Sequence, residues 1–302
     1  MIGFETTKSA LLHSYQTQKL HHAILLHGKK GSGKASFARA LATEILGGKV
    51  TPHPDLFVIE KDAEKKEIGI DKIRSISSFS NQTSAISANK FIIVDSACEL
   101  NKSSSNALLK ILEEPRPNNF LILISHNLNR ILPTIRSRCH LVRIPDLSRL
   151  DFNEILRQNN LNFAAKDAEF LAEICDNSPA DAINFGLDLT RFYELFLRSI
   201  SNKKISDELL KKIADKNFSF AIFEKSCEFF FSRLSKCSLN PEMNFYFEEE
   251  KVFLNLIRKL SPEKIFTIQD ESLNLLRKTV SLSLDKKLNF INIFNQICYK
   301  NL

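Results

Sequence analysis

The chain has 302 residues, of which 43% are hydrophobic and 25% are charged, a composition typical of a globular protein long enough to form two or three domains. Its apolar runs are too short to span a membrane, and its first residues lack the basic and apolar segments of a secretory signal, so we expect a cytoplasmic protein. The net charge of +7 permits contact with nucleic acid, but basic and acidic residues are mixed along the chain, so charge alone does not indicate DNA binding.

In the first half of the chain, short apolar runs alternate with segments of helical periodicity. The runs at 90–96 and 119–125 are almost continuously apolar, which is typical of strands buried on both faces of a parallel sheet. A further helical segment should end at Glu114, because Pro115 follows it. This alternation predicts a parallel α/β sheet. We expect its strands at 22–28, 55–60, 90–96 and 119–125, with helices at 34–46 and 71–80.

Beyond about Pro145 the strand signals fade and helical patterns take over. Short helical segments come first, and longer ones follow after about Leu189. Phenylalanines recur in one of the long segments, where we expect them to pack in the core of a helix bundle; a binding stripe is the alternative. These residues are Phe218, Phe220, Phe223, Phe229, Phe230 and Phe231.

The stretch HGKKGSGKASFA follows an apolar run and opens a helical segment, which is the context of a phosphate-binding loop. Gly28, Gly33 and Lys34 have the spacing of the pattern G-x-x-x-x-G-K-[ST], and Gly31 lies between the two outer glycines. Backbone N–H groups at the start of a helix can hold phosphate oxygens, and the lysine adds a positive charge. Ala35 replaces the Ser or Thr that binds Mg²⁺, so we expect phosphate binding without competent metal handling. The alternative is a tight strand-to-helix turn with a solvated lysine.

Asp95 ends the apolar run FIIVD and stands where ATPases of this architecture carry the aspartate that holds Mg²⁺ through water. Those ATPases usually have a glutamate next, which polarises the attacking water. Here the next residue is Ser96, whose hydroxyl is a poor base at neutral pH. Glu99 is close in sequence, but we do not expect it to point in the same direction as residue 96.

Two further motifs are more specific than the glycine-rich loop. NALLKILEEP spans Asn106–Pro115, and SRC spans Ser137–Cys139. With their order, their separation and the surrounding FIIVDSACEL, NNFLILIS and LPTIR segments, they resemble the clamp-loader branch of the AAA+ ATPases. HPDLFVIE and GIDKIRSI are also similar to bacterial members of that family. The similarity covers roughly residues 20–145 and weakens beyond them.

The resemblance implies an α/β plus all-α protein built in three parts. These are a RecA-like AAA+ parallel-sheet domain over 1–145, a small helical lid over 146–188, and a C-terminal helical collar domain over 189–302 that serves oligomerisation. Some family members carry a cysteine-rich zinc module before the HPD strand, where this chain has only GGKVT. Its six cysteines form no C-x-x-C pair, so we expect neither a metal site nor a disulfide framework.

Two kinds of clamp-loader subunit fit this outline. Motor subunits bind and hydrolyse ATP, whereas delta-prime-type subunits keep the fold and the SRC arginine but often lack a working ATPase site. Ala35 removes the metal-binding hydroxyl, Ser96 removes the water-polarising carboxylate, and Asp181 stands where motor subunits usually carry a sensor arginine. Together these departures favour the delta-prime type, with no required cofactor. Weak binding of ATP or ADP stays open.

Arg138 lies in IRSRC, near the end of an expected helix. In the clamp-loader family this arginine projects across a subunit interface toward the neighbour's ATP, so the resemblance implies a trans-acting arginine finger. The planar, permanently charged guanidinium matches phosphate geometry. The alternative is a surface arginine that compensates a helix C-terminus. We expect Arg136 to be a surface residue, and the adjacent Cys139 and His140 are not expected to form a catalytic pair.

The helix in NALLKILEEP ends in Glu113 and Glu114, whose negative charges oppose the helix dipole at that end. They indicate a basic partner or a neighbouring subunit, or else simple solvated charges. On the same helix Leu108, Ile111 and Leu112 recur on one face, so we expect them to pack against the sheet.

The resemblance thus implies a delta-prime-like subunit of a bacterial DNA polymerase III clamp loader, with no catalytic cycle of its own. Its expected partners are the motor subunits and the delta subunit and, through the complex, the sliding clamp and primed DNA; no membrane partner is expected. One alternative is a working motor ATPase with an unusual metal shell. The other is a phosphate-loop DNA-binding module outside replication, whose isolated chain would bind DNA in a salt-sensitive way.

Overall fold

The structure is a computed structural model of the chain and describes residues 2–48, 52–62, 65–215, 217–281 and 284–299. Its internal contacts divide the chain into two compact units. The sheet unit consists of 1–158 with 177–180, and the helical unit of 159–176 with 181–302. The boundary expected between 188 and 189 falls within one continuous helix, α8 (Pro179–Ser201).

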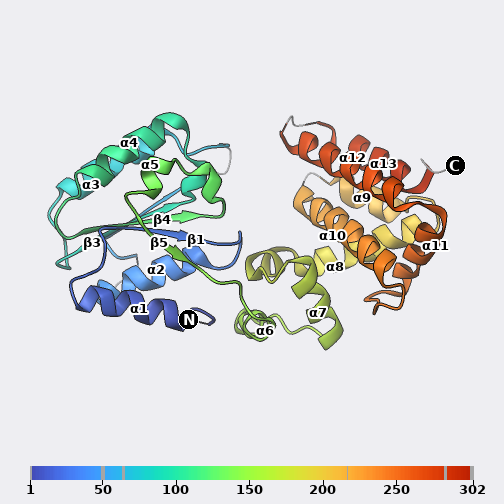
Figure 1. Ribbon diagram of the computed structural model, residues 1–302, viewed down its shortest axis with the longest axis horizontal. Helices are drawn as coiled ribbons and strands as arrows, with labels where there is room; N and C mark the ends of the chain where they lie inside the picture. Colours follow the sequence, from blue (N-terminus) through green and yellow to red (C-terminus); the bar gives the residue numbers. More distant parts are fainter. Residues whose placement is uncertain (1, 49–51, 63–64, 216, 282–283, 300–302) are drawn as a thin grey trace. The chain divides into compact units, whose positions relative to one another are not determined.

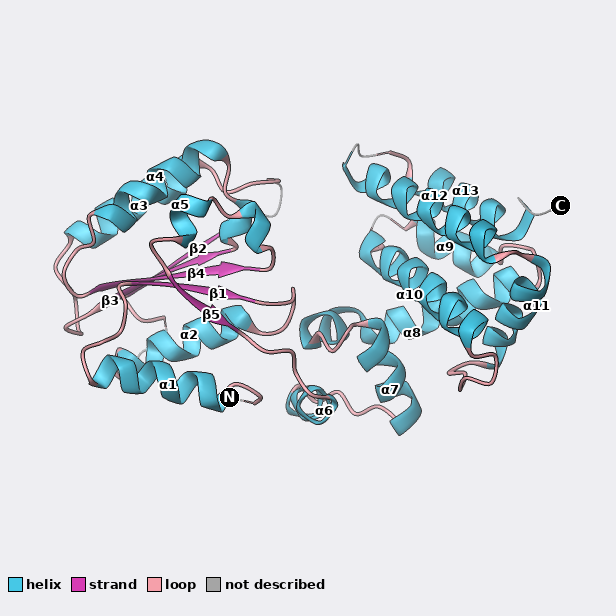
Figure 2. Cartoon of the chain, viewed as in Figure 1, coloured by secondary structure: helices cyan, strands magenta, loops and turns pink. Residues whose placement is uncertain are grey.

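The sheet unit is built on five parallel strands in the order β2-β3-β4-β1-β5 (Figure 2). All five strands therefore end at the same edge of the sheet, so residues that directly follow different strands come together there. The expected strands are confirmed, and HLVRI supplies the last one. The strands are β1 (Ala23–His27), β2 (Leu56–Glu60), β3 (Lys90–Asp95), β4 (Asn119–Ser125) and β5 (His140–Arg143).

Helices cover both faces of this sheet (Figure 1). The first face carries α1 (Glu5–Gln16) and α2 (Lys34–Ile45). The opposite face carries α3 (Ile70–Asn81), α4 (Lys102–Glu113) and the short α5 (Pro133–Arg136). A further helix of the sheet unit, α6 (Arg149–Gln158), follows β5. The predicted end of α4 before Pro115 is confirmed, because Glu114 is its first non-helical residue.

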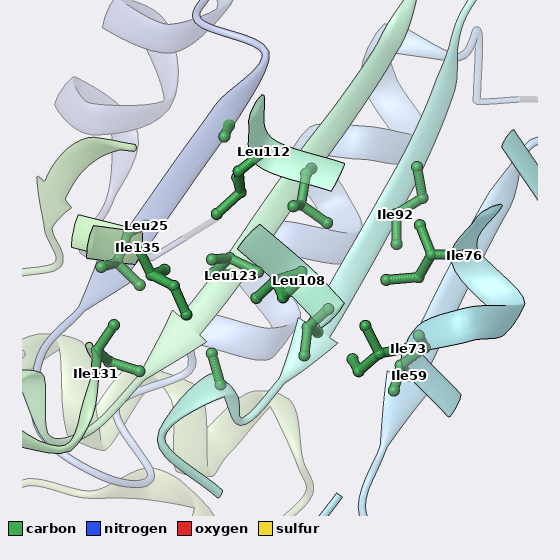
Figure 3. Packing of buried hydrophobic residues seen from close by; sticks show 14 of the residues in the cluster. Leu25, Ile59, Ile73, Ile76, Ile92, Leu108, Leu112, Leu123, Ile131 and Ile135 are labelled. Carbon is green, nitrogen blue, oxygen red and sulfur yellow. The ribbon is translucent and has the colours of Figure 1, made fainter. Parts of the chain in front are cut away.

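The apolar side chains of the strands pack into two separate cores, because successive side chains point to opposite faces of the sheet. In β1, Ile24 and Leu26 pack in the core under α1 and α2, whereas Leu25 packs in the core under α3, α4 and α5. Figure 3 shows this second core, with Leu108 and Leu112 of α4 placed over the strands. Their predicted packing against the sheet is therefore confirmed, and the continuous apolar runs follow from burial on both faces.

The helical unit packs its phenylalanines inward. Of the six predicted core residues, five are buried, and Phe218 is half-buried and stacked on Phe192. Besides α8 the unit contains α7 (Ala165–Ile174), α9 (Asp207–Ala214), α10 (Phe220–Leu239), α11 (Val252–Lys259), α12 (Pro262–Ser281) and α13 (Lys286–Tyr299).

None of the helices in the described part of the chain has the length and apolarity needed to cross a bilayer.

A buried ionic cluster ties several segments of the helical unit together. Arg233 of α10 donates from Nη2 to Oε2 of Glu250 at 3.0 Å, and the two side chains are 5% and 0% exposed. The Tyr193 hydroxyl of α8 donates to Oε1 of Glu250 at 3.3 Å, and burial raises the pKa of Tyr193 well above its usual value. Glu173 of α7 lies 3.8 Å from the Arg233 guanidinium and accepts from the Tyr246 hydroxyl at 2.7 Å.

We predict that Arg233→Met destabilises the chain by about 3–5 kcal/mol, because it leaves Glu250 buried without its cation. Arg198→Met is the matched control, since Arg198 also pairs with two glutamates but is 54% exposed, so its loss should destabilise the chain far less. Urea denaturation of the three proteins measures the difference. Equal destabilisation by both substitutions would show that burial does not decide the strength of these pairs.

Candidate functional site

The glycine-rich turn between β1 and α2 has a backbone that only glycine can adopt at its key positions. Gly31 and Gly33 have φ values of +74° and +91°, in the left-handed region. A Cβ at Gly31 would also lie 1.9 Å from the Ser178 hydroxyl oxygen. At Gly28 the constraint is close approach, because a Cβ there would lie 2.6 Å from the Ile144 carbonyl oxygen. The loop thus has the compact backbone of a phosphate cradle.

Lys34 folds back onto this loop. Its Nζ donates to the Gly28 carbonyl at 3.0 Å, to the Lys29 carbonyl, and to the Ser32 hydroxyl at 3.3 Å, and the residue is 5% exposed. Burial lowers the pKa of Lys34 to about 8, although the negative charge of Asp95 partly opposes that shift. The ammonium group therefore already has hydrogen-bond acceptors from its own chain.

A cavity of about 520 Å³ opens beside the loop at the carboxyl edge of the sheet. Gly31, Gly33 and Lys34 line it together with Asp95, so four of the predicted nucleotide-site residues meet there. Gly28 shapes the start of the loop instead, because its carbonyl holds Lys34. A volume of this size accommodates a small organic ligand.

Ser96 and Glu99 both line the acidic side of the cavity, at the two ends of the 3-10 turn Ala97–Glu99. The Ser96 hydroxyl donates to the Ile124 carbonyl, so the two side chains have different partners. The expectation that Glu99 does not point in the same direction as residue 96 stays a prediction. Glu99 is paired with Lys61 at 3.2 Å. Burial, followed by the nearby Glu60, raises the pKa of Asp95, while Arg39 and Lys34 act in the opposite direction.

The expectation that Asp181 takes the place of the sensor arginine needs correction. Ala180 lines the cavity, whereas the Asp181 carboxylate pairs with Lys225 at 2.8 Å. Consecutive residues of a helix point about 100° apart, so a shift of one residue changes which side chain faces the site. The position still provides no cation, because Ala180 presents only a methyl group.

Sequence reasoning missed a group of polar side chains at the rear of the cavity. The Cys98 thiol lies 3.3 Å from Nδ1 of His126 and 3.4 Å from the Ser96 hydroxyl. The Ser96 hydroxyl itself donates to the Ile124 carbonyl at 3.1 Å. Cys98 and His126 follow the adjacent strands β3 and β4, and their positions just after two apolar runs were the available signal. Strand order, which the runs do not contain, brings them together.

Arg138 lies on the turn between α5 and β5 and not among the residues that line this cavity. Its Nη2 is 2.9 Å from Oε1 of Glu113, its Nη1 donates to the Thr134 carbonyl at 3.0 Å, and its side chain is 38% exposed. The basic partner of Glu113 is therefore an arginine of the same chain. Cys139 beside it packs against the core, and burial raises its pKa to about 11, which argues against a nucleophile there.

Comparison with known proteins gives consistent relatives. Residues 4–148 match the family described as "DNA polymerase III, delta subunit". The chain is 33% identical over 179 residues to DNA polymerase III subunit delta' of Pseudomonas aeruginosa, a match covering 54% of this chain and 50% of that protein. It is 30% identical over 148 residues to subunit delta' of Escherichia coli, covering 43% and 44%. The chain thus matches half or less of these relatives' length.

A DNA polymerase III subunit gamma of Buchnera aphidicola is 29% identical over 282 residues, covering 86% of this chain and 75% of that protein. A solved gamma subunit-related protein of Thermotoga maritima superposes with a TM-score of 0.51 and 19% identity over 99% of this chain and 100% of that one. This likeness concerns the fold. The expected parallel-sheet α/β domain followed by a helical C-terminal region is confirmed.

The lowered pKa of Lys34 has a measurable consequence. Above pH 8 the folded chain has released this proton, whereas the unfolded chain keeps it until about 10.5, so Lys34 contributes stability that increases as the pH rises between these values. Lys34→Met lacks this contribution. We predict that the free energy of unfolding of wild type minus that of the variant increases from pH 8 to 10.5, by at most about 1.4 kcal/mol per pH unit. Urea denaturation across this range measures it, and a constant difference would contradict it.

Proposed function

The chain is a delta-prime-like member of the DNA polymerase III clamp-loader family, and on this premise we propose that it supplies Arg138 to ATP bound by a neighbouring subunit without hydrolysing ATP itself. Its partners in this role are the motor subunits and the delta subunit and, through the complex, the sliding clamp and primed DNA. The observation that carries the proposal is the position of Arg138, half-exposed on a turn and held only at the surface.

The cavity beside the glycine-rich loop supports a subunit without its own catalytic cycle. Ala35 has no hydroxyl for Mg²⁺, and Ala180 offers no cation to a γ-phosphate. The Ser96 hydroxyl is engaged with the Ile124 carbonyl and is a poor base for water. Lys34 is bound to the loop carbonyls. The glycine-rich backbone, Lys34 and Asp95 are kept, whereas positions 35, 96 and 180 lack the hydroxyl, the carboxylate and the cation that a motor subunit would use. Weak nucleotide binding is compatible with this arrangement.

The energetics allow Arg138 to leave its present position. An ion pair as exposed as that between Arg138 and Glu113 contributes about 0–1 kcal/mol. An arginine finger accelerates phosphoryl transfer by about 10³–10⁵, which corresponds to about 4–7 kcal/mol of transition-state stabilisation. The gain at a neighbouring ATP therefore far exceeds the cost of breaking the pair. Arg138 can be held by Glu113 in the isolated chain and still act in an assembly.

The first test is the DNA- and clamp-stimulated ATPase activity of a reconstituted loader. Arg138→Ala should slow hydrolysis at the neighbouring site by about 10³-fold or more, because the transition-state charge loses its cation. Arg136→Ala is the matched control from the same turn and should leave the rate unchanged. Gel filtration of each complex confirms assembly. An intact complex whose rate is unaffected by Arg138→Ala rules out the finger.

Glu113→Gln tests the restraint on the arginine. The substitution removes the charge partner but keeps the side-chain shape, so Arg138 becomes easier to release. We expect the concentration of this chain that half-maximally stimulates the motor subunits to fall by up to about fivefold, since the pair is worth at most about 1 kcal/mol. Titration of the variant against fixed motor subunits measures this. A loss of maximal rate instead would mean that Glu113 positions the arginine for catalysis.

The motor ATPase is a second candidate because Glu99 lines the cavity and could take the role of the missing carboxylate. It predicts Mg²⁺-dependent hydrolysis by the isolated chain that disappears in Glu99→Gln. Our proposal predicts no turnover by the isolated chain, with or without DNA. A phosphate-release assay on the purified protein decides between the two, with Lys34→Met as a control for contaminating ATPases.

A further inference from the structure

Behind the wall of the phosphate-loop cavity, three polar side chains from two strand ends form a compact group. The Cys98 sulfur lies 3.3 Å from Nδ1 and 3.6 Å from Nε2 of His126, and 3.4 Å from the Ser96 hydroxyl. Ser96 and His126 also lie 3.3 Å apart and both line the cavity. The role proposed for Arg138 makes no use of Cys98 or His126.

We propose that Cys98 and His126 form a thiolate–imidazole pair that makes Cys98 the reactive thiol of this chain, modified by small neutral hydroperoxides that enter through the cavity. The ring nitrogens lie within hydrogen-bond reach of the sulfur, as an activating base must. The Ser96 hydroxyl also lies 3.4 Å from the sulfur, and it can donate to a thiolate when its proton turns away from the Ile124 carbonyl. This inference does not depend on the action of Arg138.

The charges around the sulfur favour its ionised form. Burial opposes the thiolate, but hydrogen bonds from the His126 ring, Ser96, the His126 backbone and Ser125 outweigh it and lower the pKa of Cys98 to about 6. Lys34 of α2 adds a positive charge that interacts with this thiol. Asp95 and Glu99, on either side of Cys98 in the sequence, line the cavity and supply negative charges that act against it. A thiol with a pKa near 6 is about 90% ionised at pH 7, against about 1% for one near 9.

The other cysteines have the opposite environment. All six are free, and burial raises the pKa of each of the other five above its ordinary value. These residues are Cys139, Cys175, Cys227, Cys237 and Cys298. Among the cysteines, Cys98 alone combines a lowered pKa with a histidine contact, so one chain provides both the reactive site and five internal controls.

Access to Cys98 limits which reagents can reach it. The residue is only 3% exposed, and Ser96 and His126 separate it from the cavity of about 520 Å³. A molecule as small as hydrogen peroxide needs only a side-chain fluctuation to reach the sulfur, whereas a bulky disulfide reagent needs the wall to open. Size and charge therefore select small neutral oxidants.

The reaction balances with the groups present. The Cys98 thiolate attacks one peroxide oxygen, so that an S–O bond forms as the O–O bond breaks. The sulfur is oxidised by two electrons to a sulfenic acid, and the peroxide is reduced. The leaving hydroxide takes the proton that the Cys98 thiol had transferred to His126 and departs as water, which leaves the imidazole neutral.

The test uses the wild-type chain, so it does not depend on the folding of a variant. The protein is reacted with iodoacetamide at pH values from 5 to 10, unfolded after quenching, and each cysteine peptide is quantified by mass spectrometry. We expect the Cys98 labelling rate to rise with a midpoint near pH 6, and the rates of the other five to rise only above pH 9. A Cys98 midpoint near 9, or no Cys98 labelling at any pH, overturns the proposal.

The oxidation step is tested with hydrogen peroxide at pH 7, followed by catalase and labelling of the remaining thiols. Cys98 should be lost at least about tenfold faster than any other cysteine and be recovered by dithiothreitol, because a sulfenic acid is reducible. His126→Gln should slow the oxidation of the Cys98 thiol by about tenfold or more at pH 7. At pH 10 the substitution should not slow the oxidation, because the thiol ionises there without the histidine. Ser96→Ala should slow the oxidation at pH 7 less than His126→Gln does. Equal rates for wild type and His126→Gln at pH 7 rule out the pair.

Discussion

The burial of one parallel sheet on both faces is the constraint from which the functional geometry follows. It requires the strands to be apolar along nearly their whole length, so polar chemistry is displaced to the residues that follow them. The glycine-rich loop follows β1, Asp95 ends β3, and His126 follows β4. Because the strands are parallel, all of these groups reach the same edge, and one cavity collects them.

The same architecture separates two kinds of function. The cavity lies at the strand ends, whereas Arg138 lies on a turn beyond α5 and contacts α4 through Glu113. Changes among the side chains of the cavity therefore need not disturb Arg138, for which we propose a role at another subunit. In the helical unit the charged residues have a different role, since the buried pair of Arg233 and Glu250 joins α10 to the segment that precedes α11.

The strands could be predicted from the sequence because burial on both faces requires an almost continuous apolar run. The glycine-rich loop could be predicted because its residues are close together in the sequence. The pairing of Glu113 with Arg138 could not be predicted, since it depends on how α4 and the turn after α5 pack together. Likewise, contact between Cys98 and His126 requires the adjacency of β3 and β4. The expectation for Asp181 differed from the structure by one residue. That is enough to change which side chain faces the cavity, because consecutive side chains are rotated by about 100° around a helix.

The retracted position of Lys34 changes what occupancy of the loop would mean. Its ammonium group is already satisfied by two carbonyls and a hydroxyl, so a phosphate entering the cavity would exchange one set of hydrogen bonds for another. Only the difference between the two sets would appear as affinity. The loop carbonyls thus compete with any entering anion for the Lys34 ammonium group, and this competition lowers the affinity that the lysine can contribute.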